Sequence, residues 1–134
     1  MPGIDESLLE AMRLPGARGA LVADWISGLA LGAVGETPGG DAEAAAAETA
    51  ELARLAMESG TLAPADGGGA GSGKEQPPVQ DLILTTADAY HLLRFVVTAF
   101  DSTVFLYLWL DRADGNLALA RIRLAEMADR LVLG

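Results

Sequence analysis

Apolar and polar residues recur along the chain with spacings that predict three helices and five strands. Leu8, Leu9 and Met12 lie at helical spacing in the segment 5–12, which ends before Pro15 and Gly16. Two runs of small apolar residues follow, at 19–24 and 28–35. The three residues between them are few enough to predict an antiparallel hairpin.

The segment 41–59 predicts a long helix. Asp41 is a suitable N-cap, and the residues after it have high helix propensity. One stripe carries Ala45, Thr49, Leu52 and Ala56, with Ala46, Ala53 and Met57 beside it. Since most of these side chains are small, we expect the helix to be packed on more than one side, and a dimer seam is one such environment.

Three strands are predicted after a segment, 61–78, that is rich in Gly, Ala and Pro and is interpreted as a flexible loop. The strands span 79–86, 90–100 and 103–110, with short polar turns between them. In the second, Leu93 and Phe95 alternate with Arg94. The third is apolar on both faces, which predicts a central strand covered on both sides.

The chain ends with a predicted helix at 117–132, for which Asn116 is well placed as the N-cap. Along its exposed side, Arg123 is expected to pair with Glu126, and Glu126 with Arg130. The order is therefore helix, two strands, helix, three strands, helix. We predict a single α+β domain over 1–134, with one five-stranded antiparallel sheet and helices on both faces.

Composition limits the partners and the compartment. Nineteen Asp and Glu against nine Lys and Arg give a formal net charge of -10, which disfavours nucleic acid and anionic lipid. No apolar run approaches the roughly 20 residues of a membrane-spanning helix, and the first residues do not resemble a signal peptide. We therefore expect a cytoplasmic protein without direct membrane insertion.

Several candidates for catalysis or ligand binding fail on their sequence context. The run 68–74 has the glycine and lysine spacing of a phosphate-binding loop, but Glu75 follows the lysine and Pro77 opposes a helix. His91, the only histidine, has no nucleophile that the sequence places beside it. The acidic residues Glu36, Asp101, Asp111 and Asp114 match no known cation loop, and cysteines are absent. We predict no catalytic residues, no cofactor and no metal.

The two tryptophans have different expected positions. Trp109 lies on the strand that is apolar on both faces and is expected in the core. Trp25 lies in the predicted hairpin turn and, if exposed, is a candidate anchor for a partner.

Three short motifs, in order, resemble the Roadblock/dynein light chain family. Residues 14–22 (LPGARGALV) resemble its Pro-Gly step from a helix into the first strand, and 28–31 (GLAL) resemble the start of its second strand. Residues 114–121 (DGNLALAR) resemble the entry into its last helix, with Ala118 where many members have glycine. The resemblance extends from about residue 7 to about residue 132.

The resemblance implies a Roadblock/profilin-like homodimer in which the third strands pair across a two-fold axis and the second helices lie side by side. The interface residues that it implies are Ala46, Thr49, Ala53, Met57, Val79, Asp81, Leu82 and Ile83. The implied function is a non-enzymatic regulator or scaffold of a small Ras-like GTPase in bacterial signalling, with a membrane sensor protein as a further partner. The alternative is an adaptor that tethers larger proteins in any nucleotide state.

Overall fold

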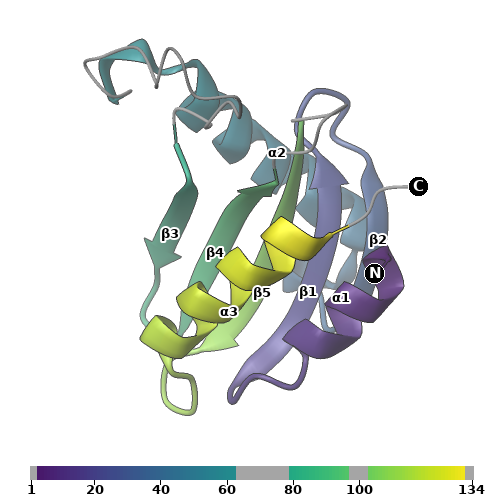
Figure 1. Ribbon diagram of the computed structural model, residues 1–134, viewed down its shortest axis with the longest axis vertical. Coiled ribbons are helices and arrows are strands. Elements are labelled where there is room, and N and C mark those ends of the chain that lie inside the picture. The colour runs from purple at the N-terminus through teal and green to yellow at the C-terminus, as the bar shows by residue number, and fades with distance from the viewer. Residues whose placement is uncertain (1–2, 63–78, 97–102, 132–134) are drawn as a thin grey trace.

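The five strands form one sheet in the order β2-β1-β5-β4-β3, and every pair of neighbours is antiparallel. The structure is a computed structural model that describes residues 3–62, 79–96 and 103–131 (Figure 1). The strands are β1 (Ala17–Asp24), β2 (Ala30–Gly35), β3 (Asp81–Thr85), β4 (Ala89–Val96) and β5 (Val104–Asp111). The α-helices are α1 (Ile4–Ala11), α2 (Ala42–Glu58) and α3 (Leu117–Arg130).

The helices cover both faces of the sheet, which confirms the predicted α+β architecture. Helices α1 and α3 lie on one face and α2 crosses the other (Figure 1). We call these the α1/α3 face and the α2 face.

Strand β5 occupies the centre of the sheet between β1 and β4, as its sequence predicts. Its residues alternate between the two clusters of buried side chains: Leu106 and Leu108 lie on the α1/α3 face, whereas Phe105 and Tyr107 lie on the α2 face. Because most of this strand is covered on both faces, it carries no charged residue between Val104 and Leu110.

The α1/α3 face is closed by large aliphatic side chains. Leu8 of α1 and Leu124 and Met127 of α3 pack on the leucines of β5 and on Leu92 of β4, and all are almost completely buried. Burial of side chains of this size contributes roughly 1.5–3 kcal/mol each. This layer is the larger hydrophobic core of the molecule.

The α2 face is closed by alanines on the helix side. Ala45, Ala46, Ala50 and Ala53 of α2 are buried above the sheet. Their small side chains let the helix approach the strands closely, but they cover little area. The aromatic residues Phe95, Phe105 and Tyr107 supply most of the bulk of this cluster.

Both predicted N-caps are present. The Asp41 carboxylate accepts hydrogen bonds from the backbone N–H groups of Glu43 and Ala44, at 3.0 and 3.4 Å. The side-chain oxygen of Asn116 accepts one from Leu119 at 3.0 Å. Helix α2 ends at Glu58 and α3 at Arg130, one and two residues before the predicted ends.

The strand boundaries differ slightly from prediction. Strand β3 is shorter than 79–86 at both ends. Strand β4 begins at Ala89 and is described to Val96, so the predicted continuation over 97–100 lies outside the described residues. Most of the predicted loop 61–78 also lies outside them, and Gly60–Leu62 form a short 3-10 turn after α2.

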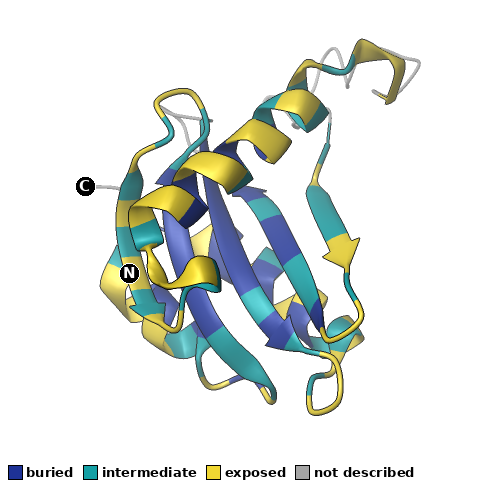
Figure 2. Ribbon diagram, turned by 180° about the vertical axis from the view of Figure 1, so that it is seen from behind, coloured by how far each residue is buried: buried dark blue, intermediate teal, exposed yellow. Residues whose placement is uncertain are grey.

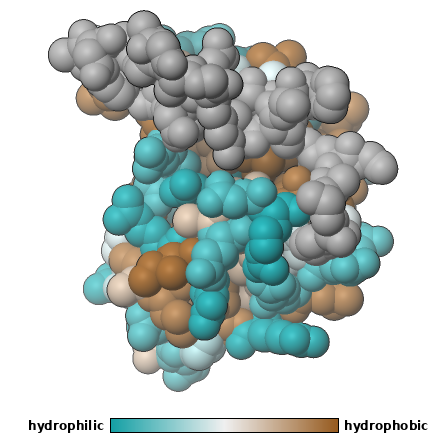
Figure 3. Space-filling view, viewed as in Figure 1, coloured by the Kyte–Doolittle hydropathy of each residue, from teal (hydrophilic) through white to brown (hydrophobic). Residues whose placement is uncertain are grey.

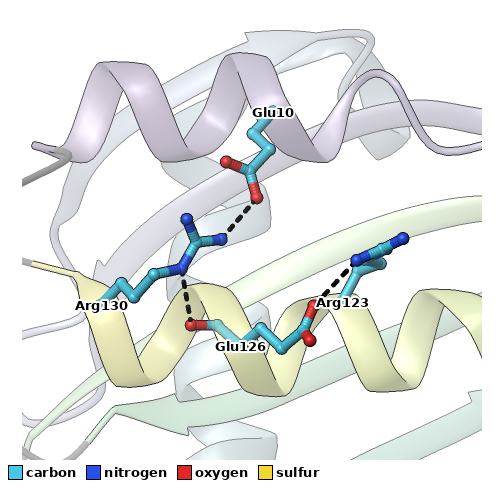
Figure 4. Close-up of polar contacts among 4 residues, drawn as sticks. All are labelled: Glu10, Arg123, Glu126 and Arg130. Atoms are coloured by element: carbon cyan, nitrogen blue, oxygen red, sulfur yellow. Dashed lines mark hydrogen bonds and ion pairs between the residues drawn. The ribbon is translucent and has the colours of Figure 1, made fainter.

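Polar contacts join the two helices of the α1/α3 face. Arg123 pairs with Glu126 at 3.1 Å, as predicted, but Arg130 reaches further (Figure 4). Its Nη2 donates to the Glu10 carboxylate on α1 at 2.8 Å, and its Nε donates to the backbone oxygen of Glu126.

The surface over these helices is largely hydrophilic with a smaller hydrophobic area (Figure 3).

At one end of the sheet, the loop that contains Gly16 lies directly against the loop that contains Gly115. Gly16 has φ of +80°, and a Cβ on it would lie 2.6 Å from the Cα of Gly115. A side chain would therefore both strain the backbone and push the two loops apart. These loops carry the first and last motifs that were identified in the sequence.

Candidate interaction surface

Helix α2 leaves part of its sheet face uncovered. It packs mainly on β1 and β2 and crosses the sheet diagonally, so that it covers only one end of the strands on the β3 side (Figure 2). On these strands Leu82, His91 and Trp109 are half-buried and Leu84 is 47% exposed. We call these four residues the open sheet surface. Trp109 was expected in the core, and it is only half-buried because α2 lies over the other half of the sheet.

Apolar side chains are also exposed on α2 itself. Leu52 is 37% exposed and Leu55 is 71% exposed. Exposed apolar side chains, on a helix and on the sheet that it crosses, are typical of a protein–protein contact where they gather into one surface. The described chain provides no element that covers it.

A row of ring contacts orders the open sheet surface. His91 and Trp109 are direct cross-strand partners and their rings stack, with centroids 6.2 Å apart. The Arg18 guanidinium lies 3.8 Å from the centroid of the Trp109 ring and also pairs with Glu36 at 3.6 Å. The row is an ordered set of partly exposed ring side chains on the α2 face.

Beneath this row, Nδ1 of His91 lies 2.6 Å from the Tyr107 hydroxyl. Burial lowers the pKa of His91, and the charge of Asp88 opposes this only in part. Burial also raises the pKa of the Tyr107 phenol. The neutral forms of both groups are therefore favoured, and a hydrogen bond joins the imidazole to the phenol.

Strand β3 forms one edge of the sheet. It carries neither lysine nor proline, the residues that commonly block an exposed edge. Its one charged residue, Asp81, is held from the α3 side by Arg121, with Nε to Oδ2 at 2.6 Å and Nη2 to Oδ1 at 3.4 Å. The edge is thus anchored to the fold through Asp81, and among the described residues no strand pairs with its other side, which we call the free edge.

The predicted interface residues fall into two groups. Ala46 and Ala53 are completely buried between α2 and its own sheet, so they have no surface to offer a partner. The others are half-buried at the edge of the α2 face or on β3: Thr49, Met57, Val79, Asp81, Leu82 and Ile83. Leu52, Leu55 and Leu84 have more exposed area but were not predicted. Leu84 shares the two-residue period of Leu82, which was the available signal.

Trp25 is half-buried and packs on the cluster of the α2 face. Its backbone N–H donates to the Thr103 oxygen at 2.8 Å, and Asp24 orders the turn by accepting from Ile26 and Ser27. Among the described residues its indole nitrogen has no hydrogen-bond acceptor. Its role as a partner anchor stays a prediction.

The candidates for chemistry are dispersed. In the described ranges no three His, Cys, Asp or Glu side chains gather as metal ligands would. Asp111 accepts from the backbone of Asp114 within its own turn, while Glu36 lies with Arg18. Asp101 and the glycine-rich run 68–74 lie outside the described residues.

None of the described helices is long and apolar enough to cross a membrane.

The sheet order, with α1 and α3 on one face and α2 on the other, defines a single-sheet α+β fold whose exposed features are an edge strand and an apolar surface. This is the Roadblock/LC7 fold, as comparison with solved structures shows. A Roadblock/LC7 domain from Streptomyces avermitilis matches with a TM-score of 0.70 and 19% identity, over 96% of this chain and 94% of that one.

Two structures of MglB match equally well. Myxococcus xanthus MglB has a TM-score of 0.72 and 18% identity, over 94% of this chain and 82% of that one. MglB in a tetrameric arrangement has a TM-score of 0.71 and 19% identity, over 95% and 83%. No protein-family model matches the sequence, and no curated protein matches it either. At this identity the likeness establishes the fold.

Proposed function

We propose that the protein is a non-enzymatic homodimer that regulates or positions a small Ras-like GTPase. The observation that carries the proposal is the combination, in a Roadblock/LC7 fold, of a free β3 edge with the adjoining open sheet surface. Pairing of two β3 strands would join two sheets, and the exposed leucines of α2 would lie near the resulting seam. The tetrameric arrangement described for MglB supports assembly of this fold from several chains.

The GTPase enters the proposal through the sequence motifs that resemble the Roadblock/dynein light chain family. A regulator of this kind acts through surface contact with its partner and needs no catalytic side chain of its own. The similar structures give no support for a membrane sensor as an additional partner, so the proposal is restricted to the GTPase.

The first test is the mass of the particle. A chain of 13.8 kDa should elute from gel filtration with light scattering at twice this mass. A monomer at every protein concentration would contradict the homodimer.

The second test is affinity capture from a lysate of the source cells, with GDP and with a non-hydrolysable GTP analogue in parallel. We expect a small GTPase to be retained mainly in one nucleotide state, and the chain alone to hydrolyse no GTP. A bait that carries Leu84→Asp, expected to be monomeric, tests whether the dimer is the form that is recognised. Recovery of the same larger protein in both states, without a GTPase, would favour the nucleotide-independent adaptor.

A further inference from the structure

The backbone of β3 determines which residues are available for pairing at its free edge. The N–H of Phe95 donates to the oxygen of Gln80 at 3.1 Å, and the N–H of Thr86 donates to that of Ala89 at 2.9 Å. Hydrogen-bonded pairs alternate along an antiparallel ladder. In the β3–β4 register, the even-numbered residues of β3 therefore bond to β4. The odd-numbered ones, Asp81, Ile83 and Thr85, turn their N–H and C=O groups outward.

The two faces of β3 restrict the symmetry further. Leu82 packs on the cluster of the α2 face and Ile83 on that of the α1/α3 face. Two identical strands that pair antiparallel in one sheet are related by a two-fold axis perpendicular to the sheet, and this axis leaves the faces unchanged. Since opposed residues in a sheet share a face, each must pair with a partner residue of the same parity. The axis must then pass beside one residue and not between two.

We infer that in the homodimer, on which this step rests, the two-fold axis passes beside Ile83. Ile83 then pairs with its own copy and Asp81 pairs with the partner's Thr85. All three outward residues of the strand form hydrogen bonds within the strand pair. On the α2 face, Leu82 lies opposite the partner's Leu84. The two-fold axis repeats this pair, so that the exposed Leu84 is covered in both chains of the dimer.

The neighbouring registers are less favourable. An axis beside Asp81 places two carboxylates opposite each other, which is destabilising. An axis beside Leu82 places Asp81 opposite the partner's Ile83. Thr85 then lies opposite a partner residue that is outside β3. An axis beside Leu84 leaves Asp81 opposite the partner's Ala87. Only the axis at Ile83 sets the Asp81 carboxylate, already bound to Arg121, beside a hydroxyl donor, the partner's Thr85.

The absence of cysteine from the sequence makes the register measurable by disulfide cross-linking. Opposed Cα atoms in an antiparallel pair are about 4.5 or 5.5 Å apart, within the roughly 4.4–6.8 Å that a disulfide spans. Under mild oxidation, we expect Ile83→Cys to form a covalent dimer. We expect Leu82→Cys and Leu84→Cys each to remain uncrosslinked alone, and a mixture of the two, with tags of different size, to give a mixed dimer.

Ile122→Cys, on the exposed surface of α3, is the matched control and should remain uncrosslinked. If Leu82→Cys or Leu84→Cys formed a covalent dimer with its own copy, the two-fold axis would pass beside that residue, one position away from Ile83. Either result would overturn the inference. A dimeric mass under reducing conditions without any of these cross-links would also overturn it, and would leave the proposed dimer standing on another surface. A wild-type monomer would instead remove the proposed dimer itself. The mixed dimer keeps the test valid if Ile83→Cys does not fold.

Discussion

The two faces of the sheet share five strands but are closed in different ways. On the α1/α3 face, two helices bring leucine and methionine side chains onto the leucines of β5, and the layer is complete within one chain. On the α2 face, one alanine-rich helix packs mainly on β1 and β2, and it leaves Leu84 47% exposed and His91 and Trp109 only half-buried. The difference indicates that the first face stabilises the fold, whereas the second is available for assembly.

The largest expected effect comes from breaking the closed face. Leu108 is completely buried on β5, and Leu108→Ala should lower the free energy of unfolding by about 2–5 kcal/mol, because it removes transfer energy and leaves a cavity. Urea denaturation followed by circular dichroism measures this loss. If the α1/α3 face is the main core, the loss should not depend on protein concentration; a loss below 1 kcal/mol would contradict that assignment.

A change on the open face should act on assembly instead of folding. Leu84→Asp places a charge where a leucine would be covered twice per dimer, and each leucine contributes roughly 1.5–3 kcal/mol. We expect the dimer to dissociate while circular dichroism still shows a folded chain. Ile122→Asp is the control, because Ile122 is 58% exposed on α3 of the other face and should leave the mass unchanged. Equal effects of both changes would remove the distinction between the faces.

The helix caps give a smaller, matched comparison. Asp41→Ala on α2 and Asn116→Ala on α3 each remove side-chain hydrogen bonds to the first turn of a helix. Each should lower the free energy of unfolding by about 1 kcal/mol. If α2 is held partly by dimerisation, the Asp41 variant should also shift the monomer–dimer equilibrium, which sedimentation velocity would detect. An effect of Asn116→Ala on that equilibrium would argue against separate roles.

The smallest effect is the pH dependence that comes from His91. Burial lowers its pKa, so the folded chain binds a proton less readily than the unfolded chain. The unfolded chain therefore binds more protons below the ordinary histidine pKa of about 6.5. Stability from this group should be complete above that pH and should decline as the pH falls towards the lowered pKa. Since His91 is the only histidine, the difference between wild type and His91→Gln in melts at several pH values isolates the effect. If the difference in stability between the two proteins did not change with pH, the pKa of His91 would be the same in the folded and the unfolded chain.

The fold was largely predictable because its strongest signals are local. Apolar residues on both faces marked β5 as central, and Asp41 and Asn116 marked two helix starts within one residue. Neither periodicity nor the family resemblance reveals what each residue of a stripe faces, so the implied interface includes Ala46 and Ala53, which are buried against their own sheet. The link between Arg130 and Glu10 joins opposite ends of the chain, beyond the reach of any spacing rule. Trp109 was placed in the core because the sequence does not show how far α2 extends across the sheet.

The contact between Gly16 and Gly115 also bears on how such chains are found. The Pro-Gly step near the start and the Gly-Asn step near the end look like two separate signatures, yet they describe one point where two backbones meet. Each is too short to be diagnostic alone. Taken together they form a single constraint with a fixed order, because a side chain at Gly16 would meet the backbone of Gly115, and a side chain at Gly115 would meet the backbone oxygen of Asp111. A search that scores both steps jointly would therefore detect distant chains of this fold that neither step identifies.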